Sequence, residues 1–190
     1  MPVCLSCVHP VCCLTPHAHA DPDMLQIGNV GLTLTEQYTH MTLWCIAGAP
    51  LLAGTDLIHA SKETLAILAN PEVTAIDQDL GKGGAIQGKL LTPSMWESAA
   101  AAKATRGGSK TEVWAKHLAD GKSIAVALLN LGDNATAISA SWELLDLPTA
   151  TTSATVRDLW AKKDIGVHTG AVHLPAVPSH GAAFLKVSWK

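Results

Sequence analysis

The sequence lacks the features that mark several classes of protein. No apolar run in its 190 residues approaches the roughly 18 residues that a transmembrane helix needs. Positive charge is not in excess, since 13 Lys and Arg stand against 16 Asp and Glu, and a net charge of -3 gives no electrostatic footprint for nucleic acid. No internal repeat is present. We therefore expect neither a membrane nor nucleic acid as a partner, and the sequence specifies no oligomeric state.

What is present describes a globular chain. The hydrophobic fraction of 48% and the charged fraction of 15% are typical of folded rather than disordered proteins. The length suffices for one medium domain or two small ones with a real core. Six tryptophans stand against one tyrosine and one phenylalanine. Such a balance is compatible with carbohydrate binding, although core packing explains most tryptophans equally well.

Residues 1–20 differ from the rest of the chain. They hold four of the five cysteines, with Cys45 as the fifth. The pair Cys4-x-x-Cys7 followed by three histidines invites a zinc site, but the spacing matches no standard finger and no second ligand pair follows. Ala18-His19-Ala20 looks like a signal-peptide cleavage site, yet no basic residue lies near Met1 and three prolines interrupt the segment. We predict an unrelated, disordered leader and no metal site.

The region 21–88 predicts alternating helices and strands. Thr33 and Glu36 form a capping box at a helix start, and Gly48 and Pro50 end that helix after apolar residues at helical spacing. The run 51–54 is typical of a short buried parallel strand. Ser61 can cap a second helix, which Asn70-Pro71 stops. The apolar run 73–76 follows, and the alternation favours an α/β fold.

The second half changes to a two-residue period. We predict a linker or insertion over 89–110, where residues 97–110 are small and polar, and a C-terminal antiparallel β-domain over 111–190. Asp120-Gly121 joins two β-type runs as a hairpin. From 136 to 142, alternate residues share one face: Thr136, Ile138, Ala140 and Trp142. Regular short strands of this kind suggest an antiparallel β-sandwich.

Three blocks resemble a known family. "DPDMLQIGNVGLTLTEQYTHMTLWCIAGAPLLAGTDL" is similar to the seventh and eighth barrel strands, with the helix between them, of glycoside hydrolase family 27. "ILANPEVTAIDQDLGKGG" resembles the segment that closes that barrel, and "VRDLWAKKDIG" with "VPSHGAAFLKV" resembles the end of the family's β-domain. The family contains α-galactosidases and α-N-acetylgalactosaminidases. The resemblance implies a (β/α)8 TIM barrel, here partial over 21–88, followed by an antiparallel β-sandwich.

The resemblance also implies a mechanism whose catalytic groups are missing. Family members are retaining enzymes without a cofactor, in which one aspartate attacks the anomeric carbon and a second serves as acid and then base. Both lie upstream of the D-P-D-M-L block in the family, whereas residues 1–20 contain no acidic residue. We therefore expect no catalytic residue in this chain, no metal, and no hydrolysis by the chain alone.

Asp21 and Asp23 are the evident substitutes for that pair. Two residues apart on an extended strand, they would face one side, with Cα atoms roughly 6–7 Å apart. Neighbours on one strand cannot flank a glycosidic bond from opposite faces, as the displacement requires. We expect Asp21 to accept backbone hydrogen bonds at the strand end. The resemblance implies that Asp23 and Met24 border the substrate pocket, and we take these two as substrate-binding residues.

Other polar residues predict structure more than chemistry. Asp56 follows the presumed eighth strand, where it could line the pocket, but we favour a structural role for it. Asp77 and Asp79 favour capping of the turn before Gly81 over metal binding. Three histidines are predicted to be surface or packing residues: His168, His173 and His180. Asn134-Ala135-Thr136 is a glycosylation sequon that has meaning only in a secreted chain.

Three interpretations of the whole chain stay open. The first is the C-terminal part of an α-galactosidase-like enzyme, whose substrate would be an α-galactoside or a galactose-containing oligosaccharide. The second is a non-catalytic β-domain module that binds carbohydrate or a partner chain. The third is a truncated gene model whose true product begins upstream. The family is often secreted, lysosomal or vacuolar, but no convincing signal assigns a compartment here.

Overall fold

The central strand of the fold is buried on both faces. The computed structural model describes residues 22–92 and 110–190. In β3 (Ser123–Asn130) every residue is buried. Ile124, Val126 and Leu128 point into one hydrophobic core, whereas the residues between them point into a second core. A nearly continuous apolar strand of this kind requires cover on both sides.

β3 lies in a six-stranded antiparallel sheet with the order β1-β2-β3-β8-β5-β6. The other five strands are β1 (Lys89–Leu90), β2 (Thr111–His117), β5 (Ser153–Asp158), β6 (Lys163–Thr169) and β8 (Ala182–Ser188). The predicted hairpin is confirmed, because β2 and β3 pair around Asp120 and Gly121. Asp120 Oδ1 accepts from the backbone N–H of Lys122 and Ser123, at 2.9 Å each, which fixes the turn.

A second sheet covers one face of the first. It consists of β4 (Thr136–Ser141) paired with β7 (Ala171–Val177). The predicted alternation is confirmed at Ile138, Ala140 and Trp142, which are buried between exposed neighbours, while Thr136 is half-buried beside a register shift. These residues share one core with Val126 and Val187 of the large sheet. The predicted antiparallel β-sandwich is therefore present.

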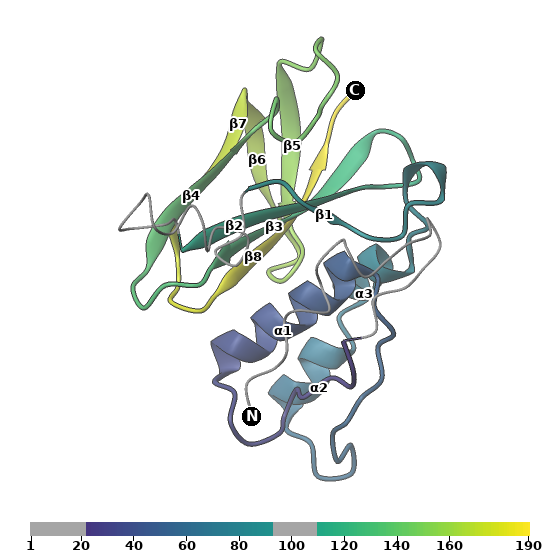
Figure 1. The fold of residues 1–190 in the computed structure, drawn as a ribbon, viewed down its shortest axis with the longest axis vertical. Coiled ribbons are helices and arrows are strands. Elements are labelled where there is room, and N and C mark those ends of the chain that lie inside the picture. The colour runs from purple at the N-terminus through teal and green to yellow at the C-terminus, as the bar shows by residue number, and fades with distance from the viewer. Residues whose placement is uncertain (1–21, 93–109) are drawn as a thin grey trace, which may run out of the picture.

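Three helices cover the opposite face of the large sheet and lie below it in Figure 1. They are α1 (Leu34–Ala47), α2 (Lys62–Leu68) and α3 (Pro71–Gln78). The capping box of Thr33 and Glu36 is confirmed, as are the ends set by Gly48 and Ser61. Their apolar residues pack directly on Trp114 and Phe184 of the sheet. No helix among the described residues has the length and apolarity to cross a membrane.

Asn70-Pro71 ends the second helix as predicted, but the apolar run 73–76 that follows does not continue the expected alternation of helices and strands. Asn70 is the N-cap of α3, and its Oδ1 accepts from the backbone N–H of Glu72 at 3.0 Å. Proline suits the first helical position, where its missing N–H has no partner to lose. Residues 73–76 are consequently helical. The same dipeptide both ends α2 and begins α3.

Among the described residues, the predicted barrel strands form one pairing. Leu25 and Ala53 form an isolated parallel bridge, in which Leu25 N–H donates to Leu52 O at 2.8 Å and Gly54 N–H donates to Leu25 O at 3.0 Å. The prediction of a buried strand at 51–54 is wrong as to burial, because Leu52 and Ala53 are exposed and Leu51 and Gly54 are half-buried; Ala53 alone makes a parallel bridge. A strand with no further neighbours cannot build a regular ladder.

The sheet begins earlier than the predicted β-domain. Lys89 and Leu90, placed by the sequence in the linker 89–110, pair with Ala115 and Trp114 of β2. Residues 93–109 lie outside the described residues, so the linker remains a prediction.

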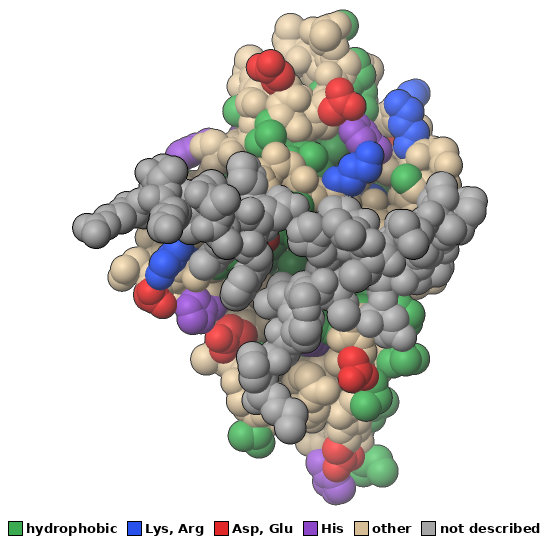
Figure 2. Space-filling view, in the orientation of Figure 1, with side chains coloured by type: hydrophobic (Ala, Val, Ile, Leu, Met, Phe, Trp, Pro, Cys, Tyr) green, Lys and Arg blue, Asp and Glu red, His purple; other side chains and the backbone are tan. Residues whose placement is uncertain are grey.

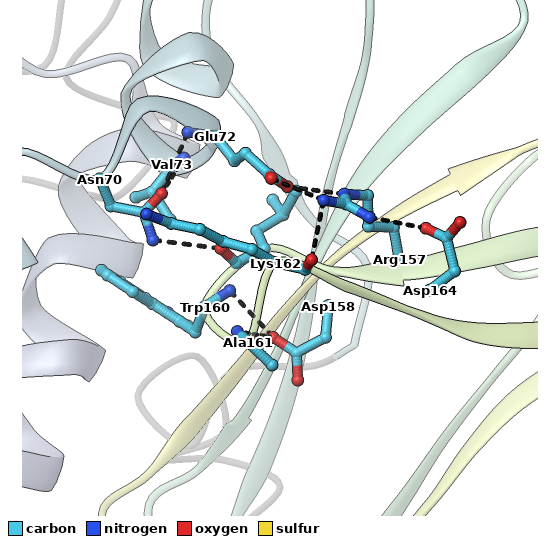
Figure 3. A network of polar contacts seen from close by, with 10 residues as sticks. Asn70, Glu72, Val73, Arg157, Asp158, Trp160, Ala161, Lys162 and Asp164 are labelled. Atoms are coloured by element: carbon cyan, nitrogen blue, oxygen red, sulfur yellow. Dashed lines mark hydrogen bonds and ion pairs between the residues drawn. The ribbon is translucent and has the colours of Figure 1, made fainter.

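Contacts at the start of α3 hold the helices to the sheet (Figure 3). Glu72 receives two hydrogen bonds from Arg157 of β5, both of 2.7 Å, and Arg157 also contacts Asp164 at 2.9 Å. Asn70 Nδ2 donates to Leu159 O at 3.1 Å while its Oδ1 caps the helix. A bidentate arginine–carboxylate pair fixes orientation as well as distance. The β5–β6 connection is thus locked against the first turn of α3.

A buried lysine holds the other end of α3. Lys116 of β2 is 2% exposed, and its Nζ donates to Ile76 O at 2.8 Å and to Asp77 O at 3.4 Å. Burial lowers the pKa of Lys116, an effect opposed by the nearby carboxylates of Asp79 and Asp77. The last carbonyl groups of a helix lack hydrogen-bond donors within the helix and carry partial negative charge. An ammonium group donates hydrogen bonds to them and also offsets that charge.

We expect the substitution Lys116→Met to lower the free energy of unfolding by about 1–3 kcal/mol, because buried carbonyls lose their donor. Urea denaturation followed by circular dichroism measures this change. Lys122→Met, at an exposed position of the hairpin turn, is the control and should shift stability by less than about 0.5 kcal/mol. Equal stability of the two variants would contradict the assigned role of Lys116.

Candidate functional site

The two predicted binding residues lie at the exposed start of residues 22–88, the described part of the predicted partial barrel, which we call the barrel remnant. Asp23 has φ +74°, and its Oδ1 accepts from the backbone N–H of Met24 at 2.7 Å. Trp44 of α1 donates from Nε1 to Asp23 O at 3.0 Å, which anchors this backbone to the helix. Asp23 is exposed, and Met24 is 46% exposed. Both side chains are therefore accessible to a ligand.

The extended geometry assumed for Asp21 and Asp23 is not found. A positive φ at Asp23 turns the chain out of the strand conformation, and a non-glycine residue adopts it at a cost in energy. The argument that both carboxylates face one side therefore does not hold. Asp21 lies outside the described residues, so its predicted backbone contacts remain a prediction.

Hydrogen bonds fix the backbone beyond Met24. Asn29 Nδ2 donates to Gln26 Oε1 at 2.8 Å and to Gly54 O at 3.0 Å, joining the two segments of the parallel bridge. A Cβ atom at Gly54 would lie 3.0 Å from Leu25 O, so glycine permits their close approach. The loop after Asp23 is therefore held from two sides.

A buried histidine supports the same segment. His40 Nε2 accepts from Gln26 N–H at 3.1 Å, and its ring lies against Trp44 with centroids 3.8 Å apart. Burial lowers the pKa of His40 to about 4, so the ring is neutral near pH 7 and can accept that bond. Sequence reasoning missed His40, although the i,i+4 spacing from Trp44 places both side chains on one helix face.

The other acidic candidates have structural contacts. Asp56 Oδ1 accepts from Ile58 N–H at 3.0 Å and its Oδ2 pairs with His59 at 2.7 Å. Asp79 caps the turn as predicted, accepting from Gly81 N–H at 2.7 Å. Asp77 instead lies at the end of α3 with a buried side chain that accepts from Gln78. Among the described residues, no three His, Cys, Asp or Glu side chains form a group that could hold a metal ion.

The electrostatics of several carboxyl groups oppose a role in acid catalysis. The pKa is lowered at Glu36 by Thr33, at Asp56 by His59 and at Glu72 by Arg157. A glycosidase general acid needs a raised pKa so that it still carries its proton near neutral pH. These three carboxyl groups are held in the ionised form and fit structural roles.

The remaining histidines and the sequon have surface positions. His173 pairs with Ser139 across the small sheet at 2.7 Å. His180 contacts Glu36 at 3.2 Å and Asp133 at 3.5 Å, and hydrogen bonding to Glu36 raises its pKa. His180 also accepts at its carbonyl from Thr39 of α1 at 2.8 Å. Asn134 of the sequon lies exposed in the turn before β4.

Apolar side chains are exposed around the barrel remnant. In Figure 2 hydrophobic side chains gather on the lower flank, over the helical part of the molecule. Eight large apolar residues of this part expose two-fifths or more of their surface: Met24, Val30, Leu34, Leu52, Leu57, Ile58, Leu65 and Leu80. Exposed apolar groups that cluster commonly mark a surface that binds another element or chain.

Comparisons with protein families give two separate matches. Residues 108–187 match the model described as the α-galactosidase C-terminal β-sandwich domain, and residues 7–79 match the model described as α-galactosidase A. The second match begins inside the leader predicted over 1–20, whose boundary remains a prediction.

Individual relatives agree with these matches. α-Galactosidase 3 of Arabidopsis thaliana is 36% identical over 166 residues, which are 87% of this chain and 34% of the relative. The crystal structure of α-galactosidase I from Mortierella vinacea superposes with a TM-score of 0.73 at 29% identity, covering 88% of this chain and 38% of that one. A β-L-arabinopyranosidase from Geobacillus stearothermophilus gives a TM-score of 0.72 at 27% identity over 89% of this chain and 37% of that one. The chain spans about a third of the length of the curated relatives it matches.

The buried His40 predicts how stability changes in acid. Its folded pKa of about 4 lies below the ordinary value of 6.5, so the unfolded chain binds more protons between these two values. Stability should therefore be lost as pH falls from 6.5 towards 4. His40→Gln, which keeps an acceptor but does not titrate, should flatten this slope in urea unfolding at several pH values. His173→Gln is the control on the surface, and equal slopes in both variants would refute the effect.

Proposed function

Because the chain belongs to the α-galactosidase (melibiase) family, of which it holds part of the catalytic domain and the β-sandwich domain, we propose that it serves the retaining hydrolysis of terminal α-galactosyl residues. In this proposal the chain supplies the β-domain and one border of the substrate pocket. The nucleophile and the acid/base come from barrel elements outside these 190 residues. The observation that supports it most is the D-P-D-M-L block, whose Asp23 and Met24 are exposed on an anchored loop.

The proposed division of roles follows from the chemistry of the site. A retaining mechanism needs two carboxyl groups about 5–5.5 Å apart on opposite sides of the sugar ring. Asp23 offers one carboxylate, which can accept hydrogen bonds from sugar hydroxyls, and Met24 offers a flexible apolar contact. One carboxylate cannot act both as the nucleophile and as the separate acid/base on the other side of the sugar. In this proposal the chain alone contributes residues that bind the substrate but not the two carboxyl groups that react with it.

The exposed apolar residues of the barrel remnant support the proposal that further barrel elements pack against it. Leu52, Leu57 and Ile58 are each more than half exposed, and they lie close in sequence to Ala53, which forms a parallel bridge with Leu25. Further parallel strands and their helices would cover such residues and extend the pairing that the bridge begins.

A second candidate function rests on the β-domain. The sandwich has its own closed core between the two sheets, which includes Trp142, Val126 and Leu185. Such a unit can act as a non-catalytic module that binds carbohydrate or a partner chain. Retention of the pure chain on a galactose-bearing polysaccharide, with mannan and cellulose as controls, tests this function.

The proposal predicts no turnover of p-nitrophenyl α-D-galactoside by the purified 190-residue chain. A chimera in which residues 22–190 replace the matching part of the Arabidopsis relative should hydrolyse it, since the chimera regains the missing barrel elements. Asp23→Ala in the chimera should lower kcat/KM by about 10- to 100-fold, as expected for a lost hydrogen bond to a charged acceptor.

The matched control is Glu63→Ala, at an exposed position of α2, which should leave kcat/KM unchanged. Turnover by the 190-residue chain alone would contradict the assignment of the reacting pair to other elements. An Asp23→Ala chimera with the kinetics of the parent would contradict the role of Asp23.

A further inference from the structure

A hollow of about 330 Å³ lies where the segment after α3 meets one end of the β-domain. We call it the Trp189 hollow. Its lining includes Lys82 from the glycine-rich turn, His117 at the end of β2, Asp146 and Thr149 from the connection between β4 and β5, and Trp189 after β8. Its size lies at the lower end of the range for small-molecule sites. Four segments distant in sequence thus meet around one space.

The lining is held in place by contacts outside the hollow. Asp79 accepts from the backbone N–H of both Gly81 and Ala119, at 2.7 and 2.9 Å, and so ties the turn that carries Lys82 to the β2–β3 hairpin. The turn is tight, since a Cβ at Gly81 would lie 1.9 Å from Ala85 O. Trp189 N–H donates to Lys122 O at 3.0 Å. The hollow therefore does not need a ligand to bring these segments together.

The backbone at Asp146 is in an unusual conformation. Asp146 has φ +53°, in the left-handed region, between the buried residues Leu145 and Leu147. Asp146 is exposed and lines the hollow, and its backbone is held in a turn in which Asp146 N–H donates to Glu143 O at 3.1 Å. Strained conformations of non-glycine residues concentrate at functional sites.

The groups in the hollow suit a ligand rich in hydroxyl groups. The rings of His117 and Trp189 meet edge to face with centroids 6.4 Å apart, which gives an aromatic wall. Lys82 donates hydrogen bonds, Asp146 accepts them, and Thr149 and a neutral imidazole do both. Burial lowers the pKa of His117, which keeps that imidazole neutral near pH 7.

The charges in the hollow discriminate between ligand classes. An anion would meet the carboxylate of Asp146, and a cation would meet the ammonium group of Lys82, whereas a neutral polyol can bond to both. We propose that the Trp189 hollow binds a neutral sugar, with one hexose unit against Trp189 and its hydroxyl groups on Asp146 and Lys82. The site uses none of the residues that the proposed hydrolytic function requires.

The experiment titrates the purified 190-residue chain with D-galactose, D-glucose and D-mannose, followed by ¹H–¹⁵N NMR spectra. Sodium D-galacturonate and D-glucosamine serve as charged counterparts. At least one neutral hexose should shift the amide signals of His117, Asp146 and Thr149 and the indole signal of Trp189 in a saturable manner. The charged sugars should bind more weakly than the neutral one.

Two variants make the result specific. Asp146→Asn keeps a residue that tolerates left-handed backbone but removes the charge, and Trp189→Leu removes the aromatic wall. Each should raise Kd by about tenfold, the effect of one lost charged hydrogen bond or one aromatic contact. His173→Gln on the small sheet is the control and should leave Kd unchanged. A dispersed spectrum of Asp146→Asn verifies that this variant is folded.

Absence of saturable shifts with every neutral hexose would overturn the proposal, as would an unchanged Kd in both variants. Shifts confined to Asp23 and Met24 would also overturn it, because they would assign the binding to the other site. The chimera assay reports on hydrolysis independently, so either proposal can fail while the other stands.

Discussion

The structure depends on the large sheet being buried on both faces. β3 sends Ile124, Val126 and Leu128 into the core of the sandwich and Ala125, Ala127 and Leu129 into the core beneath the helices. The small alanines leave room for α1 to approach the sheet, where Met41 and Trp44 complete that core. Each fully buried large apolar side chain contributes about 1.5–3 kcal/mol. The helices of the barrel remnant therefore gain their core from the β-domain rather than from a barrel.

Polar contacts at the two ends of α3 give this packing a single orientation. Asn70 and Glu72 bind the β5–β6 connection at the start of the helix, and Lys116 reaches the last carbonyls from β2. Apolar packing alone tolerates sliding, whereas a bidentate ion pair and a buried ammonium group do not. The same arrangement positions α1, whose Trp44 holds the Asp23 backbone. The proposed substrate border thus depends on contacts with the β-domain.

Local sequence signals predicted the elements that are determined locally. Thr33, Ser61 and Gly48 set helix ends through neighbouring backbone groups, and Asp120-Gly121 set a hairpin, so these predictions hold. The dipeptide Asn70-Pro71 is compatible both with the end of one helix and with the start of the next. Only the burial of Val73 and Ile76 against other elements favours a helix for the residues that follow it. Lys116 has no local signal for burial, because its partners lie about 40 residues away.

The candidate sites were predictable only to the extent that family resemblance carries them. Asp23 and Met24 came from the D-P-D-M-L block, but that block predicts neither the positive φ of Asp23 nor its anchoring by Trp44, 21 residues away. The Trp189 hollow could not be predicted, since its lining comes from four separate segments that only the folded sheet brings together.

The most direct test of the account asks whether the helices and the sandwich unfold together. Native-state hydrogen exchange of the 190-residue chain measures the opening free energy of each backbone amide. If the shared core and the contacts of α3 join the two parts, the slowest amides of α1 and those of β3 open with the same free energy. Opening of α1 at a free energy several kcal/mol below that of β3 would show that the barrel remnant unfolds alone, and would contradict the account.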